Sequence, residues 1–265
     1  MAAARRDVRL TGHPTLRHLA HRPWPLPTRP WTWRQTWHDL LFLHWPIPVA
    51  AVRALVPAPL DIQQFAGSAW VGVIPFWMSG VTRRGWPGVP GATTFPELNV
   101  RTYVSYEDRP GVWFFSLDAA SRLAVWAARG LYHLPYEFAR MRVRHIGERI
   151  EYRSARPTAE RFEASYGPAG VPLPSPAGSL EHWLTERYCL YAWSRRGALQ
   201  RAEVHHAPWV LQPAVAEVRR NDMLRVHGIE VEGPAAHLRY ARRMDVVVWS
   251  LRGVRLDAET RTPEL

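Results

Sequence analysis

Residues 97–106 read ELNVRTYVSY, and this stretch decides the fold class. Mostly apolar side chains at its even positions alternate with the polar or amphipathic Glu97, Asn99, Arg101, Tyr103 and Ser105. A period of two residues is typical of a β-strand with two different faces. A second apolar run at 112–117 follows an Arg-Pro-Gly turn, so we expect the two segments to form an antiparallel hairpin.

Short runs of the same kind continue on both sides of this hairpin. They predict further strands over 36–44, 69–78, 140–146, 149–154, 161–166, 187–193, 199–206, 237–241 and 244–252. Apolar spacing and stop signals predict helices over 48–56, 121–129, 180–187 and 217–226, the last closed by Gly228. We therefore expect a mainly β (α+β) protein, an antiparallel β-barrel with three or four short helices.

Composition shifts at the two ends suggest the domain limits. Residues 1–30 are rich in Pro and Arg, and we expect an extended arm that is partly ordered where Trp24 and Trp31 find apolar surface. Residues 31–255 are expected to form a single barrel domain, followed by a tail at 256–265. Gly and Pro crowd residues 79–96, which lead directly into Glu97, so we predict a mobile flap near a pocket mouth.

The overall composition excludes several classes of protein. The chain has 265 residues, is 47% hydrophobic and contains 14 Trp, 9 Tyr and 8 Phe, which excludes extensive disorder. Cys189 is the only cysteine, so an intrachain disulfide is impossible. The sequence shows neither an apolar run of about 20 residues nor a signal-peptide pattern, so we expect a cytoplasmic protein without a membrane partner.

The basic charge has two interpretations. The formal net charge is +11, and all 34 basic residues are arginine. Such charge suits acidic partners or nucleic acid, which leaves an Arg-rich nucleic-acid or protein-binding module as one alternative. Abundant Ala, Pro and Gly favour compositional bias instead, and Arg and Glu interleave over 140–163 as in cross-strand pairs on a wet face. We therefore expect no nucleic-acid partner.

Known motifs for cofactors and metals are absent from the sequence. It contains no Gly-rich phosphate loop, no dinucleotide fingerprint and no nucleophile elbow. His205 and His206 are adjacent, and neighbours on a strand point to opposite faces, so one metal cannot readily use both. A pair such as His44 with His206 stays open, but we expect neither a metal nor a cofactor.

The polar row on residues 97–103 is the best candidate site. If that face lies inside a barrel, Glu97, Asn99, Arg101 and Tyr103 form a pocket wall in which Arg101 can fork a carboxylate. If it faces solvent, the row has no special meaning. We predict that Arg101 is at least partly buried and paired with an acid, which would be Glu97, Asp118 or Glu186. Removal of Arg101 should then cost about 3–5 kcal/mol of stability.

Eight motifs carry a family resemblance: FLHW (42–45), VPAPLD (56–61), GSAW (67–70), FPELNVRTYV (95–104), GVWFFSLDA (111–119), LPY (134–136), LTERY (184–188) and HAPW (206–209). They resemble the DUF2071 (YqjF-like) family, over about residues 36–250. That family is similar to the acetoacetate decarboxylase-like superfamily, which implies an antiparallel β-barrel with a central cavity. It also implies a pocket acid at Glu97 and an imine-forming lysine in the region of Pro135-Tyr136-Glu137. This chain has no lysine, so lysine Schiff-base decarboxylation is excluded.

Two hypotheses share this pocket. The first is a β-barrel that binds a small, anionic organic molecule through Glu97, Asn99, Arg101 and Tyr103, with Tyr136 and Arg187 as further candidates. The second is an acid–base enzyme (isomerase, hydratase or aldol-type lyase) acting on a small carboxylate or keto compound. There Glu97 is the base, Tyr103 or Tyr136 the acid, and Arg101 the clamp or oxyanion stabiliser. A raised pKa of Glu97 in a cleft would favour the second hypothesis.

Arg187 can instead have a structural role, in which it pairs with Glu186 or Asp118 at the junction between a helix and a strand. We favour this structural role over a catalytic one. Homo-oligomerisation stays open.

Overall fold

The computed structural model describes residues 12–88 and 92–255. Its strands are β1 (Trp33–Ile47), β2 (Asp61–Ile62), β3 (Ala69–Arg83), β4 (Phe95–Tyr106), β5 (Arg109–Ala119), β6 (Tyr136–Phe138), β7 (Arg140–Ile146), β8 (Arg149–Ala155), β9 (Arg161–Pro168), β10 (Cys189–Trp193), β11 (Leu199–His206), β12 (Gln212–Asn221), β13 (His237–Val248) and β14 (Arg252–Gly253). Its helices are α2 (Val49–Arg53), α3 (Arg122–Leu131) and α4 (Leu180–Thr185), with short 3-10 turns η1 (Pro14–Arg17) and η2 (Arg225–His227). The protein is therefore mostly β, as expected.

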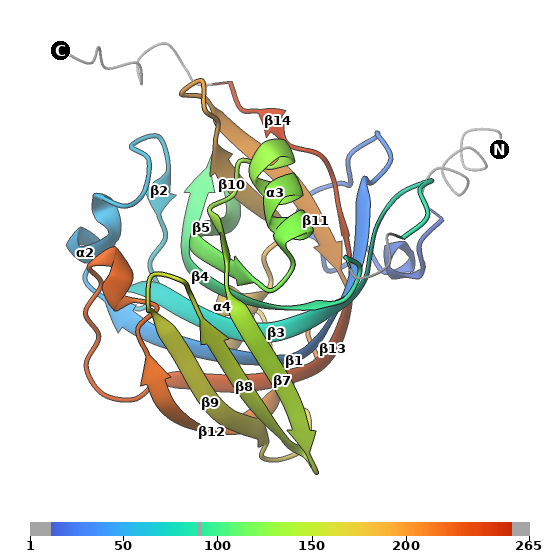
Figure 1. Cartoon of the computed structure of the whole chain (residues 1–265). Helices are drawn as coiled ribbons and strands as arrows, with labels where there is room; N and C mark the ends of the chain where they lie inside the picture. Colours follow the sequence, from blue (N-terminus) through green and yellow to red (C-terminus); the bar gives the residue numbers. More distant parts are fainter. Residues whose placement is uncertain (1–11, 89–91, 256–265) are drawn as a thin grey trace.

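The strands form one hydrogen-bonded sheet that closes on itself. Its order is β14-β11-β10-β5-β4-β3-β1-β13-β12-β9-β8-β7. Strand β11 pairs with both β10 and β13, so the strands between them make a closed ring (Figure 1). The predicted hairpins β4–β5 and β10–β11 are confirmed.

A wholly antiparallel sheet was the wrong expectation. Strand β5 pairs in parallel with β10 and with β6. Parallel neighbours need a long crossover. The chain supplies one after β5, because it leaves the ring through α3 and β7–β9 and returns to it at β10.

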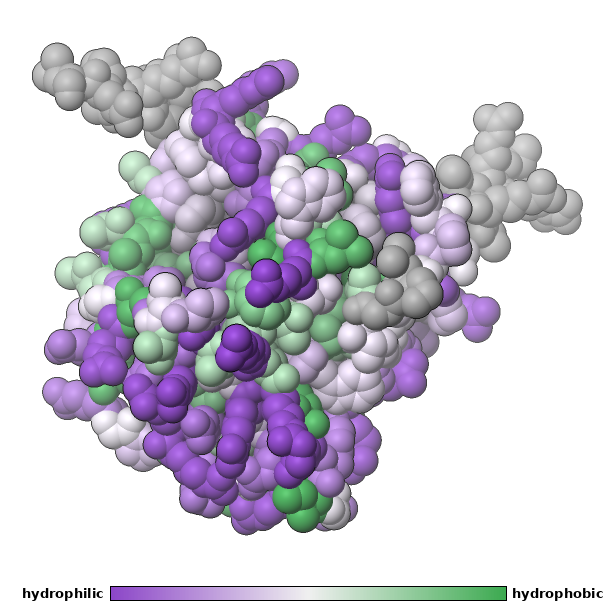
Figure 2. All heavy atoms as spheres, in the orientation of Figure 1, coloured by the Kyte–Doolittle hydropathy of each residue, from purple (hydrophilic) through white to green (hydrophobic). Residues whose placement is uncertain are grey.

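A second layer extends from the ring through β13. Strands β12, β9, β8 and β7 follow it in order, and they lie below the ring in Figure 1. Arg144 pairs with Glu151, and Arg153 with Glu163, in the strand register, so the predicted interleaving of charges is confirmed. Arg219 adds an ion pair to Glu151. Hydrophilic atoms cover this part of the molecule (Figure 2).

Strands β1 and β3 are apolar on both faces because each face covers a different core. Ile74 and Phe76 point into the cluster inside the ring. Val71 and Val73 point into the cluster between the ring and the second layer, together with Tyr152 and other aromatic residues. The strand predicted over 69–78 is therefore confirmed, and both of its faces are covered.

A bulge in β1 keeps both of its halves turned toward the ring interior. The backbone of Asp39 has φ = 52°, and the register with β3 shifts between His38 and Leu43. Before the bulge the odd positions line the interior, and after it the even positions Leu40 and Phe42 do so. The Asp39 carboxylate accepts hydrogen bonds from Trp77, His145 and Tyr240, which fixes this irregular turn.

Three of the four predicted helices are confirmed, and the prediction of the fourth is wrong. Ser121 and Ser179 cap α3 and α4 through hydrogen bonds from Ala124 and His182, each of 3.2 Å. The expected helix at 217–226 is instead the end of β12 followed by η2, because residues 214–221 pair with β9. Gly228 does cap η2, with φ = 70°.

Two strand limits also differ from expectation. Residues 237–248 form one strand, β13, where we expected a break at 242–243, because β1 pairs along almost its whole length. The predicted loop at 79–96 is shorter, since β3 continues to Arg83 and β4 begins at Phe95.

The segment from residue 12 to residue 31 lies along the ring. Trp24 packs against the cluster that contains Tyr106, and Trp31 packs against the cluster that contains Trp249. In the described residues, none of the helices has the length and apolar character needed to cross a bilayer.

Candidate functional site

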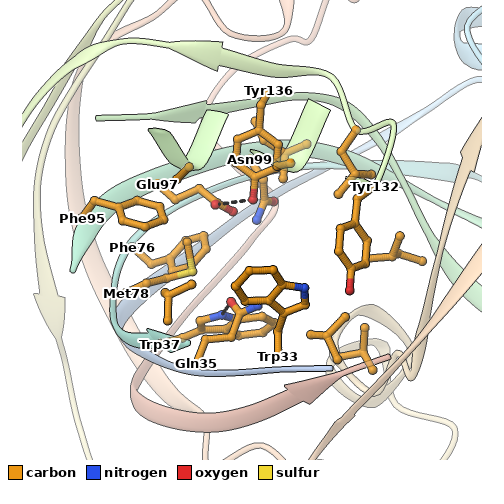
Figure 3. Close-up of a pocket in the computed structure, with 18 of the residues that line it drawn as sticks. Trp33, Gln35, Trp37, Phe76, Met78, Phe95, Glu97, Asn99, Tyr132 and Tyr136 are labelled. Atoms are coloured by element: carbon orange, nitrogen blue, oxygen red, sulfur yellow. Dashed lines mark hydrogen bonds between the residues drawn. The ribbon is translucent and has the colours of Figure 1, made fainter. Parts of the chain in front are cut away.

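A cavity of about 440 Å³ lies inside the ring of strands. Strands β1, β3, β4 and β5 build most of its wall, and α3 closes one side. Most of the wall is apolar, and its aromatic residues include Trp33, Trp37, Phe76 and Phe95 (Figure 3). Phe42 and Trp209 also line the cavity. Cavities of this size and character typically hold small organic molecules.

The Glu97 carboxyl group has a strongly raised pKa. Its side chain comes from β4 into the cavity, and only 4% of the residue is exposed. Burial raises its pKa from 4.5 to about 8; the hydrogen bond from Tyr136 opposes the shift, and the nearby Asp118 adds to it. At neutral pH, Glu97 is therefore mostly a neutral acid inside an apolar cavity.

Tyr136 is the direct partner of Glu97. Its hydroxyl donates to Glu97 Oε2 over 2.7 Å (Figure 3). Strand β6 positions Tyr136 by pairing in parallel with β5, where Leu117 lies opposite it. Burial and the adjacent Glu97 raise the pKa of Tyr136 well above 10, so it stays protonated and acts as a donor. The structure thus brings together Glu97 and Tyr136, which lie 39 residues apart.

Asn99 and Arg101 continue along the same face of β4 and also line the cavity. Asn99 is buried, and its Oδ1 has no hydrogen-bond partner. Arg101 is partly buried, as predicted, but its expected acid partner was wrong. Its Nε donates to Tyr103 Oη over 3.2 Å, and its Nη2 to the Leu184 carbonyl over 3.4 Å.

The three acids proposed for Arg101 are engaged elsewhere. Asp118 pairs with Arg156 at 2.6 Å. Glu186 accepts hydrogen bonds from Tyr188 and from the Trp209 backbone. Glu97 binds Tyr136. Because strand spacing separates positions 97 and 101 by about 13 Å, the shared face does not make them an ion pair.

Tyr103 lies behind Arg101 and is not among the residues that line the cavity. It is fully buried, and its hydroxyl lies 2.6 Å from His44 Nε2. Burial raises the pKa of Tyr103, and the neighbouring Arg101 and Arg187 oppose this shift. Of the two tyrosines predicted as the acid, Tyr136 lines the cavity and Tyr103 does not.

Arg187 lines the cavity too, but the expected pairing with Glu186 or Asp118 was wrong. Its Nε donates to the Trp183 carbonyl over 2.7 Å, and its Nη1 donates to Gln63 Oε1. The guanidinium lies 4.6 Å from the centre of the Trp183 ring and 5.0 Å from that of Tyr103. Arg187 is thus held by neutral acceptors and aromatic faces.

Helix α3 and the connection between β3 and β4 form another part of the cavity wall, and exposed side chains of both, Leu123 and Trp86, belong to it. Ala124, Ala127 and Ala128 of α3 line the cavity, and Trp86 and Pro87 line it from the connection. The predicted flap therefore lies at the site, although residues 89–91 are outside the described part. The mobility of this segment stays a prediction.

Sequence reasoning missed the aromatic wall and His206, which also lines the cavity. The signal for part of the wall was present: Trp33, Gln35 and Trp37 recur with the period of a strand, and all three face the cavity. Within residues 12–88 and 92–255, no group of three His, Cys, Asp or Glu side chains is placed to hold a metal ion.

Comparisons with known proteins agree with this architecture. The sequence pattern of DUF2071, described as an uncharacterized conserved protein, matches residues 34–245. The uncharacterized protein YqjF of Bacillus subtilis (strain 168) is 44% identical over 229 residues, which cover 86% of this chain and 94% of YqjF.

Solved structures with a similar fold are much more distant in sequence. Acetoacetate decarboxylase from Legionella pneumophila has a TM-score of 0.62 at 12% identity, with 88% of this chain and 92% of that chain covered. The enduracididine biosynthesis enzyme MppR, complexed with pyruvate, has a TM-score of 0.60 at 13% identity, with 87% and 91% covered. These likenesses concern the fold.

Proposed function

The chain belongs to the DUF2071 family, and on this premise we propose that it is a small-molecule-binding β-barrel that holds its ligand without a covalent bond. The observation that carries the proposal is the 440 Å³ cavity, whose wall is mostly apolar, with many aromatic residues and a few polar groups. Glu97, Asn99, Arg101, Tyr136 and Arg187 supply these groups. The aromatic wall would bury the apolar body of a ligand, and the polar groups would orient it.

The chemistry of the wall supports a non-covalent mode of binding. The resemblance to acetoacetate decarboxylase-like proteins implies an imine-forming lysine near Tyr136. The phenol of Tyr136 cannot form an imine. Because the sequence contains no lysine, none of its side chains carries a primary amine. The fold of a decarboxylase is therefore proposed to serve another purpose here.

Binding can be tested by isothermal titration calorimetry with 4-phenylbutanamide, a neutral molecule with an apolar body. We expect saturable binding with a negative heat-capacity change. Ala127→Phe places a ring in the cavity and should weaken binding at least tenfold. Trp126→Phe, on the exposed face of the same helix, is the control. Absence of saturable binding to the wild-type protein would count against the proposal.

The raised pKa of Glu97 favours a second candidate function, that of an acid–base enzyme. A buried carboxyl with a pKa of about 8 can exchange a proton at neutral pH, and the Tyr136 hydroxyl lies against it. In such an enzyme Glu97 would remove a proton next to a carbonyl group. Arg101 would stabilise the enolate oxygen, and return of the proton to a different carbon would complete an isomerisation. In an aldol-type reaction the enolate carbon would instead add to a second carbonyl compound, whose oxygen would take the proton from Glu97. In a hydration, Glu97 would take a proton from a water that adds to a double bond next to the carbonyl group, and would return that proton to the neighbouring carbon.

Methyl deuteration of pyruvate in D2O, followed by NMR, tests this candidate. We expect the wild-type protein to accelerate exchange, with a rate that rises with pH to a plateau above about 8, because the ionised carboxylate is the base. Glu97→Gln should abolish the acceleration. Tyr136→Phe should raise the midpoint by roughly one pH unit, since the lost hydrogen bond stabilised the carboxylate. Exchange no faster than in buffer would contradict catalysis and leave the binding proposal standing.

A further inference from the structure

Two guanidinium groups gather at one end of the cavity. Those of Arg101 and Arg187 lie 5.5 and 5.0 Å from the centre of the Tyr103 ring. Both residues also line the cavity. Two buried like charges repel each other, so this arrangement needs a compensating group.

Their protein partners do not provide negative charge. Arg187 is 7% exposed and donates to a carbonyl and to an amide oxygen, while its Nη2 has no hydrogen-bond partner. Arg101 donates to a phenol and to a carbonyl. Among residues 12–88 and 92–255, neither forms an ion pair within 4.0 Å.

The nearby acids are already neutralised or engaged. Glu186 is bound to Tyr188 and to the Trp209 backbone. Glu181 pairs with Arg239. Burial and the neighbouring Arg101 lower the pKa of Arg187 to about 10, so the Arg187 guanidinium is charged at neutral pH. The cavity therefore has a positive end within an otherwise apolar wall.

We infer that this end is an anion-binding subsite and that the ligand is a carboxylate with an apolar body. The inference rests on the proposed function, because it assigns the ligand class of the same cavity. A planar carboxylate matches the planar fork of a guanidinium and can accept from the free Arg187 Nη2. A phosphate would place a further oxygen and additional charge against apolar residues such as Phe42, which is a poorer match.

The strand sets the length of the ligand. Positions 97 and 101 of β4 are separated by about 13 Å between α-carbons. A carboxylate at the Arg101–Arg187 end would direct its body along Asn99 and the aromatic wall. The far end would then reach the Glu97–Tyr136 pair.

The test compares two probes of the same shape, 4-phenylbutyrate and 4-phenylbutanamide, by calorimetry at pH 7. Because a charge-assisted hydrogen bond is stronger than a neutral one, the acid should bind roughly 10- to 100-fold more tightly than the amide. Arg101→Gln and Arg187→Gln should remove this preference, because each should weaken binding of the acid at least tenfold more than it weakens binding of the amide. Arg142→Gln removes the same charge from the exposed side of β7 and should keep the preference.

Each outcome separates this inference from the proposed function. Equal affinity of the wild-type protein for acid and amide would overturn the anion subsite and leave the binding function intact. Binding of neither probe would overturn both. If Arg187→Gln does not fold, Arg101→Gln and Arg101→Lys decide: the lysine variant should retain part of the preference, because it keeps the charge and loses the fork.

Discussion

The buried Glu97 carboxyl ties the stability of the protein to pH. Its pKa is about 8 in the folded chain and 4.5 in the unfolded one, so between these values the folded state holds a proton that the unfolded state releases. Its contribution to stability is therefore full below pH 4.5 and falls as pH rises toward 8. The loss is on the order of 5 kcal/mol.

Glu97→Gln should remove this pH dependence, since an amide keeps the shape of the neutral acid and accepts from Tyr136. We expect equal melting temperatures for variant and wild type at pH 5, and a higher one for the variant at pH 8.5. Thermal melts across this range measure the difference, with the exposed Glu148→Gln as the control. A difference between Glu97→Gln and wild type that does not change with pH would contradict the assignment.

Arg101 and Arg156 should respond very differently to truncation. Asp118 is fully buried and pairs with Arg156, so Arg156→Ala leaves an uncompensated charge and should cost about 3–5 kcal/mol. Arg101→Ala leaves no carboxylate unpaired and should cost less than about 1 kcal/mol. Urea denaturation of both variants tests the contrast, and a similar loss in both would show that Arg101 has an acid partner after all. The sequence alone predicted a loss of about 3–5 kcal/mol of stability for removal of Arg101, and the smaller value replaces that prediction.

At the scale of elements, alternation predicted well which residues share a face but not what they contact. Glu97, Asn99 and Arg101 all line the cavity, as the period of two requires. Tyr103 also occupies an odd-numbered position of the strand, yet Arg101 covers it and its hydroxyl is hydrogen-bonded to His44. Contacts such as Glu97–Tyr136 depend on how β6 reaches β5, and no local pattern contains that information.

Strand β12 shows how tertiary pairing overrides local preference. Residues 217–221 are rich in Glu and Arg, which form helices readily, and Gly228 supplies a helix stop. The hydrogen bonds to β9 nevertheless keep the segment extended. The bulge at Asp39 is similar, because its cause is a carboxylate that bonds to three distant side chains.

Helix α3 should control access to the cavity. It contributes Ala124, Ala127 and Ala128 to the wall, while Leu123 and Leu131 line the cavity and remain exposed. Ala128→Trp should therefore slow association of 4-phenylbutanamide at least tenfold in stopped-flow measurements, with little change in melting temperature. Arg122→Trp, which adds the same ring on an exposed position outside the wall, is the matched control. Equal slowing by both variants would place the entrance elsewhere.

At the scale of the whole molecule, the ring depends on a narrow seam. Strands β11 and β13 are joined by three residue pairs, Val204–Val248, His205–Val247 and His206–Val246. The N-terminal segment crosses this seam and bonds to both sides. Thr15 contacts the backbone of Asp245, and His21 donates to the carbonyl of His206 over 2.9 Å. The composition of this segment predicts partial order but not the seam, which exists only after β11 and β13 have paired.

Arg22 belongs to this N-terminal segment, residues 12–31, which we call the strap. Its substitution tests whether the strap stabilises the closed ring. Its guanidinium donates to the Val204 carbonyl over 2.6 Å and forms a buried ion pair with Glu203. Arg201 and Arg109 also approach Glu203, so Arg22→Ala should cost about 2–3 kcal/mol, less than the loss of a sole partner. Because the strap spans the seam, amide hydrogen exchange should accelerate in β11 and in the end of β13 but not in β3. Arg17→Ala, on an exposed position of the same segment, should change neither quantity. Unchanged exchange in β11 of Arg22→Ala would mean that the ring closes without the strap.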